Sequence, residues 1–167
     1  MLELADLSLV VDCAGQPATL IHQASGRFPE GHFCAILGPS GCGKSTLIKL
    51  IAGLALPTAG KLRWRGRDIS EDHDLEPNEI GYVPQFSITH EHLTVLETVE
   101  NAVRLRVAGI TRAEFYARVQ GLLAETGLQD IAMRRVSVLS GGQRRRLALA
   151  IELASRPALL APYQFTT

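Results

Sequence analysis

The stretch Gly38-Pro39-Ser40-Gly41-Cys42-Gly43-Lys44-Ser45 decides the fold of this chain, because it matches the phosphate-loop pattern G-x-x-x-x-G-K-[ST]. Its glycines let backbone N–H groups converge on a phosphate without a side chain in the way. Lys44 is expected to reach the β- and γ-phosphates of a nucleotide, and the Ser45 hydroxyl to hold Mg²⁺. We therefore predict a nucleotide-phosphate site over residues 38–46, which includes Thr46.

The sequence around this loop predicts a strand before it and a helix after it. The apolar run Phe33–Leu37 lies between two glycines and is typical of a strand buried on both faces. A helix is expected from Lys44 to Ala52, with Gly53 as its C-terminal stop. A helix N-terminus at the loop adds a partial positive charge for the phosphates.

The other elements follow from periodicity and capping signals. Residues 2–11 alternate apolar and polar with one slip, which predicts an edge strand, and residues 19–21 are a candidate partner. Short strands are expected at residues 61–64, 80–83 and from 158 onward. Helices are expected over residues 94–107, 113–125 and from 140 to Pro157, the first and last with capping boxes. The chain is thus strand-rich first and helical afterwards.

Composition places the chain among ordinary globular proteins. It has 167 residues, of which 46% are hydrophobic and 20% charged. Lys and Arg total 17, as do Asp and Glu, which argues against a general nucleic-acid binder. No apolar run approaches the 18 residues of a membrane span, and the N-terminus carries acids where a signal peptide has basic residues. A cytoplasmic location is expected.

A second motif, Leu139-Ser140-Gly141-Gly142-Gln143, is more specific than a capped helix start, because capping explains Ser140 and Gln143 but not both glycines. With GPSGCGKST, GYVPQ and LSGGQRRRLALA in this order, the chain resembles the nucleotide-binding domain of ABC transporters. These pieces match that family's Walker A loop, Q-loop and signature motif. The resemblance extends from Leu2 to Leu160.

The resemblance implies a fold class: α/β, a P-loop NTPase (RecA-like) core with an antiparallel β subdomain and an inserted helical subdomain, incomplete at the C-terminus. It implies one ATP-binding domain over residues 1–167. Within it, residues 1–85 form the core and β subdomain, 86–139 the helical subdomain, and 140–167 the signature helix and the start of the Walker B strand.

The resemblance also implies ligands, partners and roles. The ligands are ATP and Mg²⁺, and the family's ATPase works as a head-to-tail dimer in which the signature motif of one subunit faces the Walker A loop of the other. Ser140, Gly141, Gly142 and Gln143 would form that second anion site, since they begin a helix. Gln85 would sense the γ-phosphate and Mg²⁺ beside Lys44. A membrane-spanning permease would be the other partner, with this chain peripheral on the cytoplasmic face and no nucleic acid bound.

Some positions leave alternatives open. Residues 86–107 resemble the same region in ATP-binding domains of exporters whose permeases are of the ABC-2 type, including the white-type subfamily. The positions Leu93, Val95, Leu96 and Val99 fit the core of an ordinary helix equally well. The run 144–146 is interpreted as a solvated basic helix face, and His90 and His92 as surface residues. No aromatic residue occurs within residues 1–27, where the family stacks adenine, so similar affinities for ATP and GTP are expected.

The largest departure from the family lies after the signature helix. There the family has a Walker B strand ending in Asp and Glu, followed by a switch histidine, yet this sequence has no Asp or Glu after Glu152 and no His after His92. We therefore expect residues 33–37 to lack a strand neighbour, and the chain to be inactive in hydrolysis alone. The prediction is an ATP-binding subunit of an ABC transporter. One alternative is a non-hydrolysing nucleotide-binding module or inactive fragment. A chromosome-maintenance or DNA-repair ATPase is ranked last, because it needs heptad coiled coils between the motifs and the sequence shows no heptads there.

Overall fold

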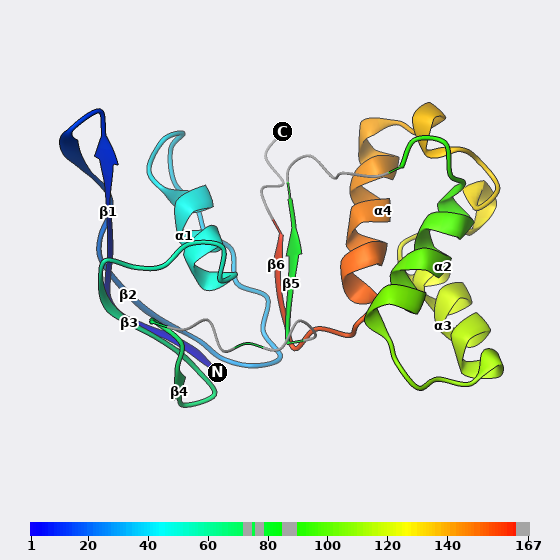
Figure 1. Cartoon of the computed structure of the whole chain (residues 1–167), viewed down its shortest axis with the longest axis horizontal. Helices are drawn as coiled ribbons and strands as arrows, with labels where there is room; N and C mark the ends of the chain where they lie inside the picture. The colour runs from blue at the N-terminus through cyan, green and yellow to red at the C-terminus, as the bar shows by residue number, and fades with distance from the viewer. Residues whose placement is uncertain (72–74, 76–78, 85–89, 163–167) are drawn as a thin grey trace. The chain divides into compact units, whose positions relative to one another are not determined.

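The computed structural model describes the chain except residues 72–74, 76–78, 85–89 and 163–167 (Figure 1). The chain divides into two compact units, Met1–Leu75 and Glu76–Thr167. The first unit combines an antiparallel sheet with one helix. The second combines a short parallel sheet with three helices.

The first unit is built on four antiparallel strands, β1 (Leu2–Cys13), β2 (Gln16–Phe28), β3 (Ala59–Trp64) and β4 (Arg67–Asp68), in the order β2-β1-β3-β4. Helix α1 (Lys44–Ile51) follows the phosphate loop and contacts β2. The hydrophobic side chains buried in this unit come from the inward positions of the strands, from α1 and from Ile69 just after β4. They are Leu2, Leu4, Leu7, Leu9, Ile21, Leu50, Ile51, Leu62, Trp64 and Ile69.

The slip in the alternation of residues 2–11 is a β-bulge. Pairing of β1 with β2 shifts register between Leu4 and Leu7, where Asp6 has a φ of 49°. The bulge returns Leu7 and Leu9 to the inner face, so both are buried together with Leu4. Gly60 of β3 approaches this bulge so closely that an added Cβ would overlap the Asp6 carbonyl. The sequence pattern therefore marked a real backbone feature.

Two strand predictions were wrong in detail. β1 is not an edge strand, because β2 hydrogen-bonds to one side of it and β3 to the other. Residues 33–37 do not form a strand, and Phe33 and Leu37 are 89% and 88% exposed. Neither sheet of the described residues includes these positions, and an apolar run alone does not make a strand without a partner.

The second unit contains β5 (Ile80–Val83) and β6 (Leu159–Pro162), which pair in parallel with Ile80 opposite Leu159. Helices α2 (Val95–Arg106), α3 (Arg112–Glu125) and α4 (Gly141–Leu153) pack together, with the 3₁₀ turns η1 (Gln129–Ile131) and η2 (Val136–Val138) between α3 and α4. The predicted strands 80–83 and 158 onward and the helices predicted over 94–107 and 113–125 are confirmed within about two residues. The helix predicted from 140 to Pro157 begins where expected but ends earlier, at Leu153.

Capping boxes begin all three helices of this unit. Thr94, Thr111 and Ser140 each accept a hydrogen bond from the backbone N–H three residues on, and that residue's side chain accepts one in return. The hydrogen bonds from the backbone and hydroxyl of Thr94 hold the pKa of Glu97 below its usual 4.5, and Thr111 does the same for Glu114. Each helix start is thus specified locally by its own sequence.

The core of the second unit, called the helical unit below, lies between α2, α3 and α4. Its fully buried side chains include Val95, Val99, Val103, Leu122 and Leu147. In α4, Leu147 and Ala150 are buried and Ile151 is partly buried, and the C-cap Ala154 is buried too, which confirms the apolar face predicted for this segment. This core holds α4 at a fixed position within the unit.

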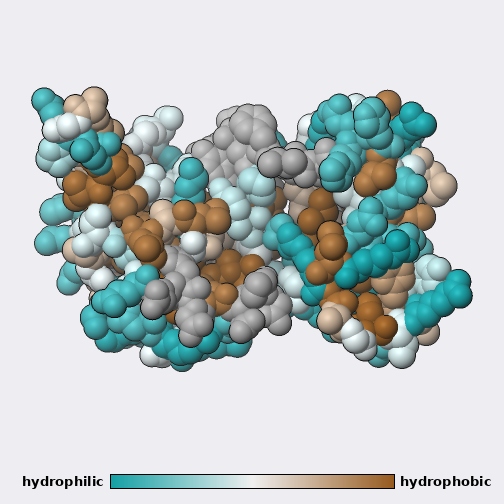
Figure 2. Space-filling model, viewed as in Figure 1, coloured by the Kyte–Doolittle hydropathy of each residue, from teal (hydrophilic) through white to brown (hydrophobic). Residues whose placement is uncertain are grey.

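Both units also expose hydrophobic side chains among hydrophilic ones (Figure 2). In the helical unit, the exposed large hydrophobic residues are Leu105, Tyr116, Met133 and Val138. Among the described helices, none is both long and apolar enough to cross a membrane.

Candidate functional site

The phosphate loop curves tightly between residue 38 and the start of α1. Gly41 and Gly43 have φ angles of 82° and 89°, which residues other than glycine rarely adopt. The Cys42 backbone N–H donates to the Pro39 carbonyl at 3.4 Å, and a Cβ on Gly38 would lie 2.7 Å from the Cys42 Sγ. Pro39 and Ser40 are exposed at the top of this curve. Gly41 and Gly43 are therefore required by the backbone itself, whereas Gly38 leaves room for the Cys42 side chain.

Gly43 also fixes the loop against the sheet. An added Cβ there would lie 2.8 Å from the Leu20 carbonyl oxygen and 2.9 Å from Ile21 Cδ1, both on β2. Such contacts are closer than real side chains tolerate, so only glycine allows this approach. The loop is consequently supported by β2 as well as by α1.

The N-terminus of α1 has no side-chain cap. Gly43 occupies the N-cap position, no acidic residue lies in the first turn, and the first hydrogen bond of the helix runs from Leu47 N–H to the Gly43 carbonyl at 2.8 Å. The N–H groups of Lys44, Ser45 and Thr46 therefore have no partner within the helix. Together with the positive end of the helix dipole, they form a site suited to an anion.

Lys44 is folded back over the loop that precedes it. Its Nζ donates to the Gly38 carbonyl at 2.8 Å and to the Pro39 carbonyl at 2.6 Å, and lies 3.7 Å from the Cys42 Sγ. Within the described part of the chain, the half-buried hydroxyls of Ser45 and Thr46 make no hydrogen bond. One ammonium and two hydroxyls thus lie at or beside the uncapped helix start.

The signature residues form the N-terminus of α4 in the other unit. The Ser140 hydroxyl accepts from the Gln143 backbone N–H at 3.3 Å, and Gln143 Oε1 accepts from the Ser140 N–H at 2.9 Å. Leu139 is buried, whereas Gly141 and Gly142 are exposed with no atom within 4 Å of an added Cβ. The glycines leave an open approach to the backbone at this helix start.

The arginine run of α4 is exposed at Arg145 and Arg146, as its composition suggested, but Arg144 is half-buried and hydrogen-bonded. Arg144 donates to the Leu139 carbonyl at 3.3 Å and to the Ser137 carbonyl at 2.9 Å, and pairs with Glu91 at 3.2 Å. Arg146 donates to the Gly127 carbonyl at 3.0 Å. Arg144 therefore fastens the turn that presents the signature residues, a role that no local sequence signal indicated because its partners are backbone carbonyls.

The C-terminal end of α4 is held by the two neighbouring helices. Arg106 of α2 makes two hydrogen bonds to Glu152, at 2.8 and 2.7 Å. Arg118 of α3 donates to the Leu153 and Ala154 carbonyls, and burial lowers its pKa. Cations at the C-terminal carbonyls complement the helix dipole. The signature helix is thus anchored at both ends within the helical unit.

The other residues considered for the site are Gln85 and the two histidines that follow it. Gln85 lies outside the described residues. His90 and His92 are exposed, in line with their interpretation as surface residues. Where the structure describes side chains, no group of three or more His, Cys, Asp or Glu residues is arranged to hold a metal ion.

Comparison with known proteins decides the family. The sequence matches the ABC transporter family over residues 21–161, which includes both glycine-rich motifs. The chain belongs to the ABC transporter family. The predicted family is therefore confirmed.

Curated relatives from this family are ATP-binding proteins of import systems. The sulfate/thiosulfate import ATP-binding protein CysA of Pseudomonas aeruginosa is 42% identical over 133 residues, 78% of this chain and 40% of the relative. The sn-glycerol-3-phosphate import ATP-binding protein UgpC 2 of Agrobacterium fabrum is 38% identical over 156 residues, 92% of this chain and 40% of the relative. The chain spans about 40% of the length of these relatives. The exporter subgroup predicted from residues 86–107 is not confirmed.

Solved structures of ABC cassettes share the fold. The dimeric MJ0796 cassette, described as a bacterial ABC transporter cassette, has a TM-score of 0.83 and 28% identity, covering 96% of this chain and 72% of that chain. A post-hydrolysis dimer of the same cassette, bound to ADP and Pi, has a TM-score of 0.82. The predicted P-loop NTPase fold is therefore confirmed.

Proposed function

We propose that this chain is the ATP-binding subunit of an ABC transporter, which couples ATP binding and hydrolysis to transport across a membrane. The observation that carries the proposal is the uncapped N-terminus of α1, whose free N–H groups lie beside the ammonium of Lys44. The names of the relatives support it, because CysA and UgpC 2 are ATP-binding proteins of import systems.

At this site each residue has a distinct task. The backbone of residues 38–46 would bind the phosphates, since its N–H groups converge at a positive helix end. The Lys44 ammonium would leave the Gly38 and Pro39 carbonyls for the β- and γ-phosphates, which offer charge-assisted hydrogen bonds in place of neutral ones.

Mg²⁺ fits this site through Ser45. Its hydroxyl makes no hydrogen bond within the described residues, and Mg²⁺ takes few protein ligands because phosphate oxygens and waters complete its shell. When bound, the ion neutralises charge on the β- and γ-phosphates. Gln85 is proposed as the second protein contact to the ion, on its place in the motif order alone.

The signature turn supplies a second anion site, on a different copy of the domain. Gly141 and Gly142 leave the start of α4 open, and the dimeric MJ0796 cassettes are solved relatives of this fold. We propose a homo- or heterodimer in which Ser140–Gln143 of one subunit faces the phosphate loop of the other. A membrane-spanning permease is the further partner proposed, which would place the chain at the cytoplasmic face of the membrane.

Hydrolysis in this family uses a carboxylate at the end of the Walker B strand, and residues 153–167 contain none. Phosphoryl transfer to water needs a residue that orients the attacking water. Residues 1–167 are therefore proposed to bind nucleotide, with the carboxylate for hydrolysis supplied from outside them. A non-hydrolysing nucleotide-binding module is the alternative.

Binding of a fluorescent ATP analogue to the 167-residue chain tests the proposal. Lys44→Ala is expected to weaken binding by about 100-fold, since a hydrogen bond to a charged group contributes about 1.5–3 kcal/mol. Lys49→Ala is the matched control, because Lys49 is an exposed lysine in the last turn of the same helix. Equal affinities of wild type and Lys44→Ala would overturn the assignment of the phosphate loop.

A further inference from the structure

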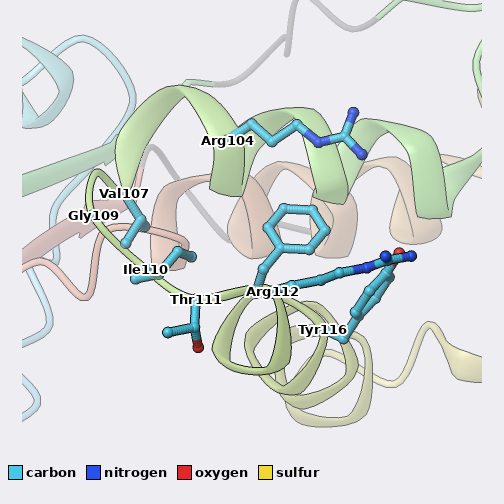
Figure 3. Close-up of a pocket in the computed structure, with 8 residues that line it drawn as sticks. Arg104, Val107, Gly109, Ile110, Thr111, Arg112 and Tyr116 are labelled. Carbon is cyan, nitrogen blue, oxygen red and sulfur yellow. The ribbon is translucent and has the colours of Figure 1, made fainter.

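A surface pocket of about 440 Å³ lies where residues 107–111 join α2 to α3 (Figure 3). Arg104 reaches it from the last turns of α2, and Arg112 and Tyr116 from the first turns of α3. Phe115 and Ile110 contribute its apolar lining. None of the residues assigned above to nucleotide binding contributes to it. Its volume lies within the range of ligand sites.

The pocket pairs two arginines with two aromatic rings. The Arg104 guanidinium lies 5.2 Å from the Phe115 ring centroid, and the Arg112 guanidinium 5.6 Å from that of Tyr116. The two rings meet edge to face at 5.4 Å. A guanidinium that stacks through its face keeps the N–H groups along its edge available for an acceptor. The rings therefore hold two cations in place without satisfying their hydrogen-bond donors.

Local carboxylates of the described residues leave most of these donors without a partner. Across the described residues, Arg112 makes no hydrogen bond or ion pair. Arg104 pairs only with Glu100, at a long 3.4 Å. The nearby Glu114 is occupied by the Thr111 N–H and hydroxyl, both at 2.7 Å. The residues that line the pocket therefore include two arginines and no acidic residue, beside an apolar surface.

The exposure of the pocket indicates the kind of occupant. The side chain of Arg104 is 61% exposed and Tyr116 is 46% exposed. Sites for free small ligands bury most of the ligand, whereas a polypeptide adds contacts on the surrounding surface. We propose that this pocket docks an acidic segment of a partner polypeptide. Its carboxylates accept hydrogen bonds from Arg104 and Arg112, and a neighbouring apolar side chain packs on Phe115 and Tyr116.

A random dodecapeptide library displayed on phage tests the proposal with the 167-residue chain as bait. The Arg104→Gln/Arg112→Gln double variant serves for counter-selection. We expect enriched peptides that place Asp or Glu beside an aromatic or aliphatic residue. Failure to enrich any sequence over the double variant, or enrichment of peptides without acidic residues, would overturn the proposal.

Fluorescence polarisation with the most enriched peptide then measures the individual residues. Arg112→Gln and Tyr116→Ala are each expected to weaken binding at least about tenfold, with unchanged far-UV circular dichroism. Arg134→Gln, which removes an exposed arginine outside the pocket, is expected to bind as wild type. If Arg134→Gln weakens peptide binding equally, the effect comes from net charge and the pocket is not the binding site. Phenylacetate competing as tightly as the peptide would show a small-carboxylate site and also refute polypeptide docking.

Discussion

Two helix N-termini of this chain carry glycine-rich motifs, and they are built in opposite ways. At α1 the N-cap is Gly43, with a left-handed φ of 89° and no capping side chain. At α4 the N-cap is Ser140, in extended conformation and closed by a capping box with Gln143. The first leaves backbone donors without partners, whereas the second satisfies part of them internally.

The difference separates two kinds of anion site. An uncapped start has N–H groups that no protein group occupies, so a phosphate has only water to displace there. A capped start is stable by itself and offers its open glycines to a ligand presented by another molecule. This contrast agrees with the proposed roles of the phosphate loop and the signature turn on two subunits.

Exchange of a glycine for alanine at each helix start should give the largest contrast. Gly43→Ala forces a side chain into a left-handed backbone and against Leu20 and Ile21. We expect a loss of about 1–3 kcal/mol in the free energy of unfolding, together with loss of nucleotide binding. Urea denaturation and fluorescent ATP titration measure the two effects.

Gly141→Ala is the matched control, because an added Cβ there meets no atom within 4 Å. Since alanine is the better helix former, we expect unfolding free energy to be unchanged or raised by up to about 1 kcal/mol. If both alanine variants lose equal stability, the contrast between the two helix starts is refuted.

Nucleotide should shield the loop but not the rest of the chain from alkylation. Cys42 lies within the loop and Cys13 at the end of β1, and both are exposed. At a nucleotide concentration about ten times the Kd, labelling of Cys42 should slow about tenfold while Cys13 is unaffected. Mass spectrometry of maleimide-treated protein reports both sites in one sample. Equal labelling of Cys42 with and without ATP would argue against occupancy of the loop.

Removing the cap of the signature helix should have a moderate effect on stability. Ser140→Ala deletes the oxygen that accepts from the Gln143 N–H, so we expect a loss of about 1 kcal/mol in the free energy of unfolding. Ser137→Ala is the control, since the Ser137 side chain is exposed and makes no hydrogen bond among the described residues. An unchanged chemical-denaturation midpoint for Ser140→Ala would show that this cap contributes nothing.

Lowering the pH should weaken two of the three capping boxes slightly and leave the third unchanged. The boxes of α2 and α3 use Glu97 and Glu114, whose pKa values are lowered, while that of α4 uses Gln143. A lowered pKa stabilises the fold above the usual 4.5, and this contribution disappears as pH falls through the folded value. We expect amide protection at the starts of α2 and α3 to fall in that window and that of Gln143 to stay constant. Glu97→Gln should remove the change at α2, and a parallel loss at Gln143 would contradict the explanation.

Sequence reasoning found the elements that local patterns specify. The capping boxes at Thr94 and Ser140 located two helix starts correctly, and the slip between Leu4 and Leu7 coincides with the bulge at Asp6. It misjudged residues 33–37, because an apolar run says nothing of the strand that must pair with it. It missed the role of Arg144, because the backbone carbonyls that it binds come from the turn before α4 and carry no side-chain signature.

The sequence by itself indicated the family and both proposed anion sites, because short-range chemistry defines them: glycines where the backbone must turn or stay open, a lysine at a helix start, and a serine with a glutamine three residues on. Only the tertiary structure decided that β1 lies inside its sheet, that Gly43 is fixed by its approach to β2, and that arginines hold both ends of α4. These features depend on contacts between residues far apart in the chain, which no local pattern records.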